Sequence, residues 1–88
     1  MKVLVLYRPN SDHGRLVEDF VRDYERAGHG GKVELFSIDT REGSAMASLY
    51  DVMEYPSIMV TRDDGSIVRT WQGKILPLQN EVAAFAYS

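Results

Sequence analysis

The most constraining feature of this sequence is a proline that stands directly before an apolar run typical of a β-strand. Pro56 follows Tyr55 and precedes the run SIMVT, residues 57–61. Because proline has no N–H, it fits best at the start of a strand, where no ladder hydrogen bond is lost. It also pushes the preceding tyrosine toward extended geometry. We therefore expect a strand to begin at Ser57, with the backbone groups of Tyr55 and Ser57 facing outward as an edge at which another chain docks.

Apolar runs predict three further strands. The near-continuous run over residues 2–7 is typical of a strand covered on both faces, and therefore central in its sheet. Another strand is expected over 33–38, and a last one over 66–71. The Asp64-Gly65 pair before that last strand is a strong hairpin signal. Since a connection of helical length separates the first two strands, we expect them to be parallel.

Helical patterns occur between and after these strands. Residues 10–12 (Asn, Ser, Asp) are alternative N-caps of a first helix that Gly28 ends. A second, short helix is expected to start at a Ser44 cap and to run to residue 50. A last amphipathic helix falls within 76–86, with Pro77 in its first turn. The prediction is a single α/β domain over the whole chain, with the element order βαβαββα.

Composition excludes several classes of function. The 88 residues contain no cysteine, which removes disulfides, thiolate metal sites and thiol catalysis. The formal net charge is −3, with basic and acidic residues interleaved, so nucleic acid is not expected as a partner. No apolar run approaches the roughly 20 residues needed to cross a bilayer. The N-terminus does not have the pattern of a signal peptide, so we expect a cytoplasmic protein without a membrane partner.

Three sequence features together resemble the thioredoxin/glutaredoxin superfamily over nearly the whole chain. The run ASLYDVMEYPS, residues 47–57, looks like the family's passage from a small-residue helix through a Tyr-x-Val turn to a cis-proline. The Asp64-Gly65 pair matches its hairpin turn, and Gly73 matches the glycine after its fourth strand. The resemblance implies a thioredoxin-like α/β fold with a mixed four-stranded sheet, helices on both faces, and Pro56 in the cis form at the start of the third strand.

The chain departs from that family at the redox centre. Ser11 and Gly14 stand where the two cysteines of the C-x-x-C pair are expected, and Val5 falls near the family's buried carboxylate. The resemblance therefore carries over the fold and the groove beside the proline, but not thiol-disulfide exchange. A second family, the glutathione transferases, places a Ser or Tyr in this region to activate the glutathione thiol. By that resemblance, Ser11 and Tyr7 are candidates for the same role.

Each candidate side chain also has an ordinary structural explanation. Ser11 is either an N-cap or a hydroxyl that stabilises an anion at a helix N-terminus. His13 beside Asp12 is either a general base or a solvated loop residue. Trp71 is either an anchor of a binding surface or a ring packed beneath the last helix. No acidic run has the spacing of a calcium loop, so we expect no metal and no other cofactor.

The function predicted from these residues is binding rather than catalysis. We expect a non-redox, thioredoxin-like domain, monomeric, that binds an extended peptide or protein segment at the edge beside Pro56. The predicted groove consists of Ser11, Asp12, His13, Tyr55, Pro56, Ser57 and Trp71, with no catalytic residue. One alternative is a glutathione-binding or glutathione-dependent protein that uses the hydroxyl of Ser11 or Tyr7. The other alternative is a structural subunit of a larger assembly.

Overall fold

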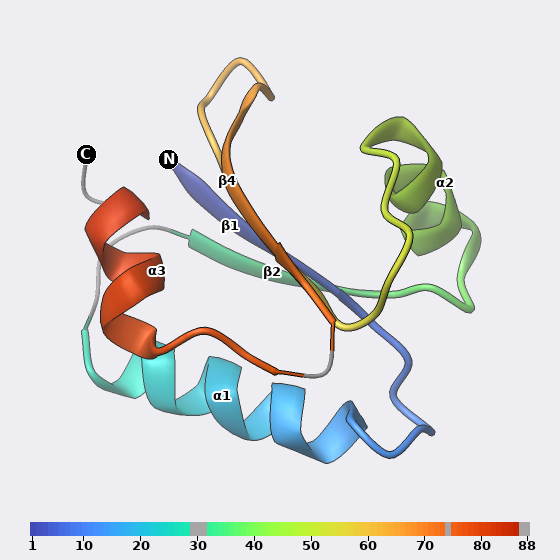
Figure 1. Ribbon diagram of the computed structural model, residues 1–88, viewed down its shortest axis with the longest axis horizontal. Coiled ribbons are helices and arrows are strands. Elements are labelled where there is room, and N and C mark those ends of the chain that lie inside the picture. Colours follow the sequence, from blue (N-terminus) through green and yellow to red (C-terminus); the bar gives the residue numbers. More distant parts are fainter. Residues whose placement is uncertain (29–31, 74, 87–88) are drawn as a thin grey trace.

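The structure is a computed structural model that describes residues 1–28, 32–73 and 75–86 (Figure 1). Four strands and three helices follow one another in a mixed α/β arrangement, as the apolar runs predict. No helix among the described ranges is long and apolar enough to cross a membrane. In chain order the elements are β1 (Lys2–Tyr7), α1 (Gly14–Arg26), β2 (Lys32–Ser37), α2 (Arg41–Leu49), β3 (Ser57–Thr61), β4 (Ile67–Gln72) and α3 (Gln79–Ala86).

The four strands form one mixed sheet in the spatial order β2-β1-β3-β4. β1 pairs in parallel with β2, while β1 with β3 and β3 with β4 are antiparallel. The first strand is therefore central, which confirms the expectation from its unbroken apolar run. β3 is central as well, and this corrects one prediction. Ser57 lies opposite Leu6 on one side and Gln72 on the other and is fully buried, so it offers no free edge.

Helices cover both faces of the sheet, because alternate residues of β1 point in opposite directions. Val3, Val5 and Tyr7 belong to a core beneath α1 and α3. Leu4 and Leu6 belong to a smaller core beneath α2. In Figure 1, α1 and α3 lie together on one side of the sheet, and α2 lies alone on the other.

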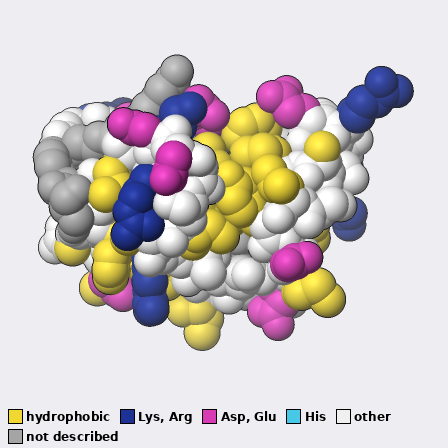
Figure 2. All heavy atoms as spheres, turned by 90° about the horizontal axis from the view of Figure 1, so that it is seen from above, with side chains coloured by type: hydrophobic (Ala, Val, Ile, Leu, Met, Phe, Trp, Pro, Cys, Tyr) yellow, Lys and Arg dark blue, Asp and Glu magenta, His cyan; other side chains and the backbone are white. Residues whose placement is uncertain are grey.

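The core beneath α2 is the less completely covered of the two. In Figure 2, hydrophobic side chains gather on the surface between α2 and the turn that joins β3 to β4. A short helix of nine residues spans only part of this face of the sheet. Consequently, several large side chains packed against this core are only partly buried: Phe36, Ile38, Met46, Tyr50 and Tyr55.

The first helix begins later than expected, and its N-cap is different. α1 starts at Gly14 and His13 is the N-cap residue, with no hydrogen bond from its side chain to the helix. Ser11 is therefore not a cap; its hydroxyl donates to the carbonyl oxygen of Arg8 at 2.6 Å. A Cβ at position 14 would collide with the carbonyl oxygen of Pro9. This close approach of two backbone segments requires glycine and fixes the first residue of the helix.

The second helix begins earlier than expected. The hydroxyl of Thr40, not Ser44, accepts the capping hydrogen bond from the N–H of Gly43, at 3.0 Å. The same hydroxyl donates to the carbonyl oxygen of Ser37 at 2.7 Å. Since a Cβ at position 43 would collide with that carbonyl oxygen, the helix can start here only with glycine at this position.

Glycine ends the first helix and turns the hairpin where the sequence predicts. Gly28, after α1, has φ +74°, and Gly65, between β3 and β4, has φ +90°. α3 differs from the expectation because it starts at Gln79, after Pro77 rather than around it. The N–H of Leu78 donates to Glu81 Oε1 at 3.1 Å, which caps the new start. Leu78 itself is 69% exposed, so it does not belong to a buried helix face.

Candidate functional site

Three connecting segments meet at one end of the sheet. Leu6 near the end of β1 lies opposite Ser57 at the start of β3, and Ser57 lies opposite Gln72 at the end of β4. The segments 8–13 and 50–56 and residue Gly73 therefore lie at the same end of the sheet, at the lower right of Figure 1. This end brings together the predicted residues from Ser11 to His13 and the Tyr55-Pro56 pair.

The peptide bond between Tyr55 and Pro56 is cis, and the segment around it is held on both sides. The carbonyl oxygen of Pro56 accepts a hydrogen bond from the N–H of Gly73 at 3.0 Å. The side chain of Gln72 accepts from the N–H groups of Met53 and Glu54, at 3.1 and 3.3 Å. Gln72 was not among the predicted site residues; its role depends on a side-chain contact between β4 and a distant loop, which no local pattern indicates.

Tyr55 is the residue at which this network is interrupted. Within the described part of the chain, no hydrogen bond reaches its backbone N–H or its backbone C=O. The residue is partly exposed, and its ring packs against the core beneath α2. By contrast, the side chains of Pro56 and Ser57 are fully buried, so Tyr55 is the partly exposed residue of this three-residue stretch.

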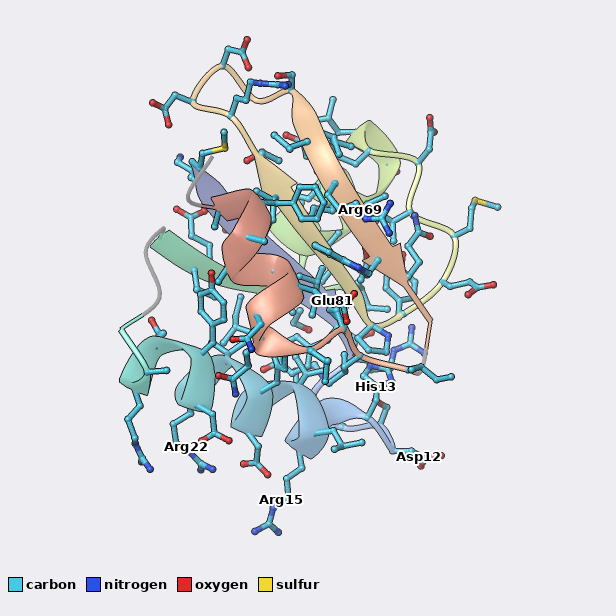
Figure 3. All side chains as sticks on the ribbon, turned by 60° about the vertical axis from the view of Figure 1, so that its left-hand side comes forward. Asp12, His13, Arg15, Arg22, Arg69 and Glu81 are labelled. Carbon is cyan, nitrogen blue, oxygen red and sulfur yellow. The ribbon has the colours of Figure 1, made fainter. Side chains whose placement is uncertain are left out.

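The segment after β1 is closed by its own hydrogen bonds. The N–H of Arg8 donates to Nε2 of His13 at 3.1 Å, and the N–H of Gly14 donates to the carbonyl oxygen of Ser11 at 3.2 Å. Because Nε2 of His13 accepts a backbone proton, the imidazole is not free to act as a general base through that nitrogen. In Figure 3, Asp12 points away from the molecule, while His13 lies against it.

The hydroxyl group of Tyr7 has a raised pKa and therefore stays protonated at neutral pH. Its hydroxyl donates to Glu18 Oε2 at 2.8 Å. Burial of the ring, then this hydrogen bond and the negative charge of Glu18, raise the pKa of Tyr7 to about 12. A tyrosine that activates a thiol donates a hydrogen bond to the thiolate; here the Tyr7 hydroxyl already donates to the carboxylate of Glu18.

Trp71 lies on the other side of the sheet from the ring of Tyr55. It is opposite Ile58 in the register and packs against the core beneath α1 and α3. Its ring meets that of Phe85 edge-on at 5.8 Å, and the guanidinium of Arg69 lies 5.4 Å from its centroid. The indole N–H is buried and has no hydrogen-bond partner among the described residues. Of the two interpretations of Trp71, packing beneath the last helix matches this position.

Two cavities lie at this end of the molecule, one on each side of the segment after β1. A cavity of about 380 Å³ on the α2 side contains Arg8, Asp51 and Tyr55 in its wall. Hydroxyl and apolar groups complete it: Ile38, Ser44, Ala47, Ser48, Val52 and Met53. A second cavity, of about 320 Å³, lies at the start of α1 and is lined by Ser11, Asp12, His13 and Leu16.

Of the charged side chains in these cavities, some form an ion pair and others do not. Arg8 forms an ion pair with Asp39, with Nε and Oδ1 3.3 Å apart. Asp12 and Asp51 are exposed, and neither takes part in an ion pair within the ranges that the structure describes. Asp51 has φ +53°, a left-handed conformation that Asp tolerates better than most residues. This conformation just after α2 turns the chain toward Tyr55, and no expectation from the sequence included Asp51 in the site.

The arrangement brings hydroxyl, carboxylate and guanidinium groups to one end of the sheet. No three His, Asp or Glu side chains in the described part of the chain gather as a metal site would require. No protein-family model matches the sequence, and no curated protein matches it. The geometry of this end of the sheet is therefore the basis for a functional proposal.

Proposed function

We propose that this chain is a thioredoxin-like domain without redox chemistry that binds an extended peptide or protein segment at Tyr55. Support for the family comes from the element order βαβαββα and the strand order β2-β1-β3-β4, with Pro56 directly before β3. Support for binding comes from the same end of the sheet, where three segments surround Tyr55.

The open backbone of Tyr55 is the observation that carries the proposal. Its neighbours are fixed, because Glu54 is bonded to Gln72 and Pro56 is bonded to Gly73. A donor and an acceptor held in place by rigid neighbours bind an extended chain by backbone pairing, with little loss of conformational freedom in the protein. The partner then adds one short strand segment beside residues 54–56.

The proposal includes no bond-making step. The chain has no thiol, and the hydroxyl protons of Ser11 and Tyr7 are donated to the Arg8 carbonyl and to Glu18. For glutathione activation, either hydroxyl would first have to give up a hydrogen bond of 2.6 or 2.8 Å. Glutathione is therefore the comparison ligand in the test, not the proposed one.

A selection from a random peptide library, followed by NMR of the isotope-labelled protein, tests this function. We expect selected peptides to shift the amide signals of Tyr55, Glu54 and Gly73 in a saturable way. Methylating the peptide backbone nitrogen that pairs with Tyr55 should abolish binding, whereas methylation at the adjacent residue should have little effect. Reduced glutathione, added alone, serves as the comparison.

Other outcomes would overturn the proposal. Saturable shifts at Ser11 and Tyr7 with glutathione, and none with peptides, would favour the glutathione alternative. If no peptide is selected and light scattering shows a stable oligomer, the structural-subunit alternative would stand instead.

A further inference from the structure

The two cavities at this end of the sheet, one of which Tyr55 lines, differ in chemistry, and this difference indicates which side chains a bound segment carries. The inference rests on the proposed binding at Tyr55. In an extended chain, successive side chains point to opposite sides. A segment paired with Tyr55 continues the plane of the sheet, so its neighbouring side chains point toward the α1 side and the α2 side in turn.

The α1 side offers the apolar side chain of Leu16, because the carboxylate in the same cavity wall, Asp12, points away from the molecule in Figure 3. Leu16, in the wall of the smaller cavity, is 59% exposed although it stands in the first turn of α1. Ile75 and Leu78, between β4 and α3, are also exposed, at 91% and 69%.

The α2 side offers hydroxyl groups and a carboxylate. Ser44, Ser48 and Asp51 line the larger cavity, and Arg8 in the same wall is already paired with Asp39. The charge left without an ion pair among the described lining residues is therefore the negative charge of Asp51. Glu54, next to Tyr55, is exposed and adds a second carboxylate that forms no ion pair with any described residue.

We propose that the partner segment carries an apolar side chain and a lysine or arginine at adjacent positions. The apolar side chain lies against Leu16, and the cationic side chain enters the cavity that contains Asp51. We choose a cationic side chain by charge complementarity, because the carboxylate of Asp51 forms no ion pair with any described residue. The partner is a protein or peptide segment, since a backbone is required to pair with Tyr55.

Fluorescence anisotropy with four synthetic peptides tests the proposal. The four peptides have the same sequence except at two adjacent positions. The first position is leucine or serine, and the second position is lysine or glutamate. We expect the leucine-lysine peptide to bind most tightly, and replacing lysine by glutamate to weaken it about five- to tenfold. This preference should shrink on going from low salt to about 0.5 M salt, because exposed charges are screened.

Matched protein variants assign each preference to its cavity. Asp51→Asn keeps a residue that tolerates positive φ and should remove most of the lysine preference. Leu16→Ala should weaken the leucine peptides about three- to tenfold and leave the serine peptides nearly unchanged. Glu25→Gln and Leu35→Ala, at exposed positions outside both cavities, are the controls and should change neither preference.

The two proposals fail in different ways. If peptides from the library shift Tyr55 but lysine and glutamate bind equally, binding at Tyr55 stands and the charge preference is wrong. The preference is also wrong if Asp51→Asn leaves it intact. If neither the library nor the four synthetic peptides bind, both proposals are wrong.

Discussion

At the residue scale, the bond between Tyr7 and Glu18 links stability to pH. The Tyr7 hydroxyl lies 2.8 Å from Glu18 Oε2, and its pKa rises from the ordinary 10.0 to about 12. The unfolded chain loses this proton near pH 10, while the folded protein keeps it until about pH 12. Between these values the folded state binds more protons, so its stability is complete below pH 10 and falls as pH rises through this window.

The corresponding prediction concerns Tyr7→Phe. Because the folded state keeps the Tyr7 proton up to about pH 12, the wild type should lose unfolding free energy as pH rises through this window. The variant should lose less, as measured by urea unfolding at a series of pH values. A spectrophotometric titration of the wild type should show one late-ionising tyrosine that is missing from the variant.

Glu18→Gln separates the two causes of this shift. Because burial is the largest single cause and does not depend on Glu18, the late ionisation should move toward lower pH but stay above 10. An ionisation at the ordinary value in this variant would show that the carboxylate, not burial, is responsible.

At the scale of single elements, apolar runs were sufficient to predict the strands, but hydroxyl residues were not sufficient to predict the caps. Several polar residues precede each helix, and propensity alone does not choose among them. The choice is made by close backbone approaches at Gly14 and Gly43, which bring distant carbonyl groups against the first turns. Those approaches depend on the packed sheet, so the caps at Ser11 and Ser44 were predicted wrongly.

The cap of α2 gives the second prediction. Thr40→Ala removes an acceptor for the Gly43 N–H and should cost about 1 kcal/mol of unfolding free energy. The matched change Ser44→Ala lies inside α2 at an exposed position and should be neutral or slightly stabilising, because alanine is the better helix former. Urea unfolding of both variants measures the difference. Equal losses in the two variants would contradict the assignment of the cap to Thr40.

For the candidate site, local sequence could identify Tyr55 but not its surroundings. The proline rule applies to adjacent residues, and the backbone before Pro56, to which it points, has no hydrogen-bond partner among the described residues. Ser57 was predicted wrongly as an edge, because a strand's own sequence does not say how many neighbours it has. The contributions of Arg8, Asp51 and Gln72 come from three separate segments that meet only in the folded sheet.

At the scale of the whole molecule, the two faces of the sheet are unequally supported. One face packs against two helices, whose fully buried residues include Val17 and Val82. The other packs against α2, whose only buried residues are Gly43 and Ala47 within the described helix. Apolar burial is the main favourable term in folding, and neither of these two residues buries a large side chain. We therefore expect α2 to be the helix whose packing against the sheet contributes least apolar burial.

The last prediction follows from this asymmetry. In native-state hydrogen exchange followed by NMR, the amides of α2 should exchange faster than those of β1, β3 and the buried part of α1, because a weakly packed unit opens without global unfolding. Leu6→Ala should destabilise the whole protein, since Leu6 lies in the central strand β1 and is fully buried. Met46→Ala, on the partly buried face of α2, should accelerate exchange mainly within that helix. Equal protection of α2 and β1 would mean that the thin core beneath α2 is no weaker than the core beneath α1 and α3. Fast opening of α2 would also move Ser44 and Ser48 in the wall of the larger cavity, so that cavity would change shape on binding the cationic side chain that we propose for the partner.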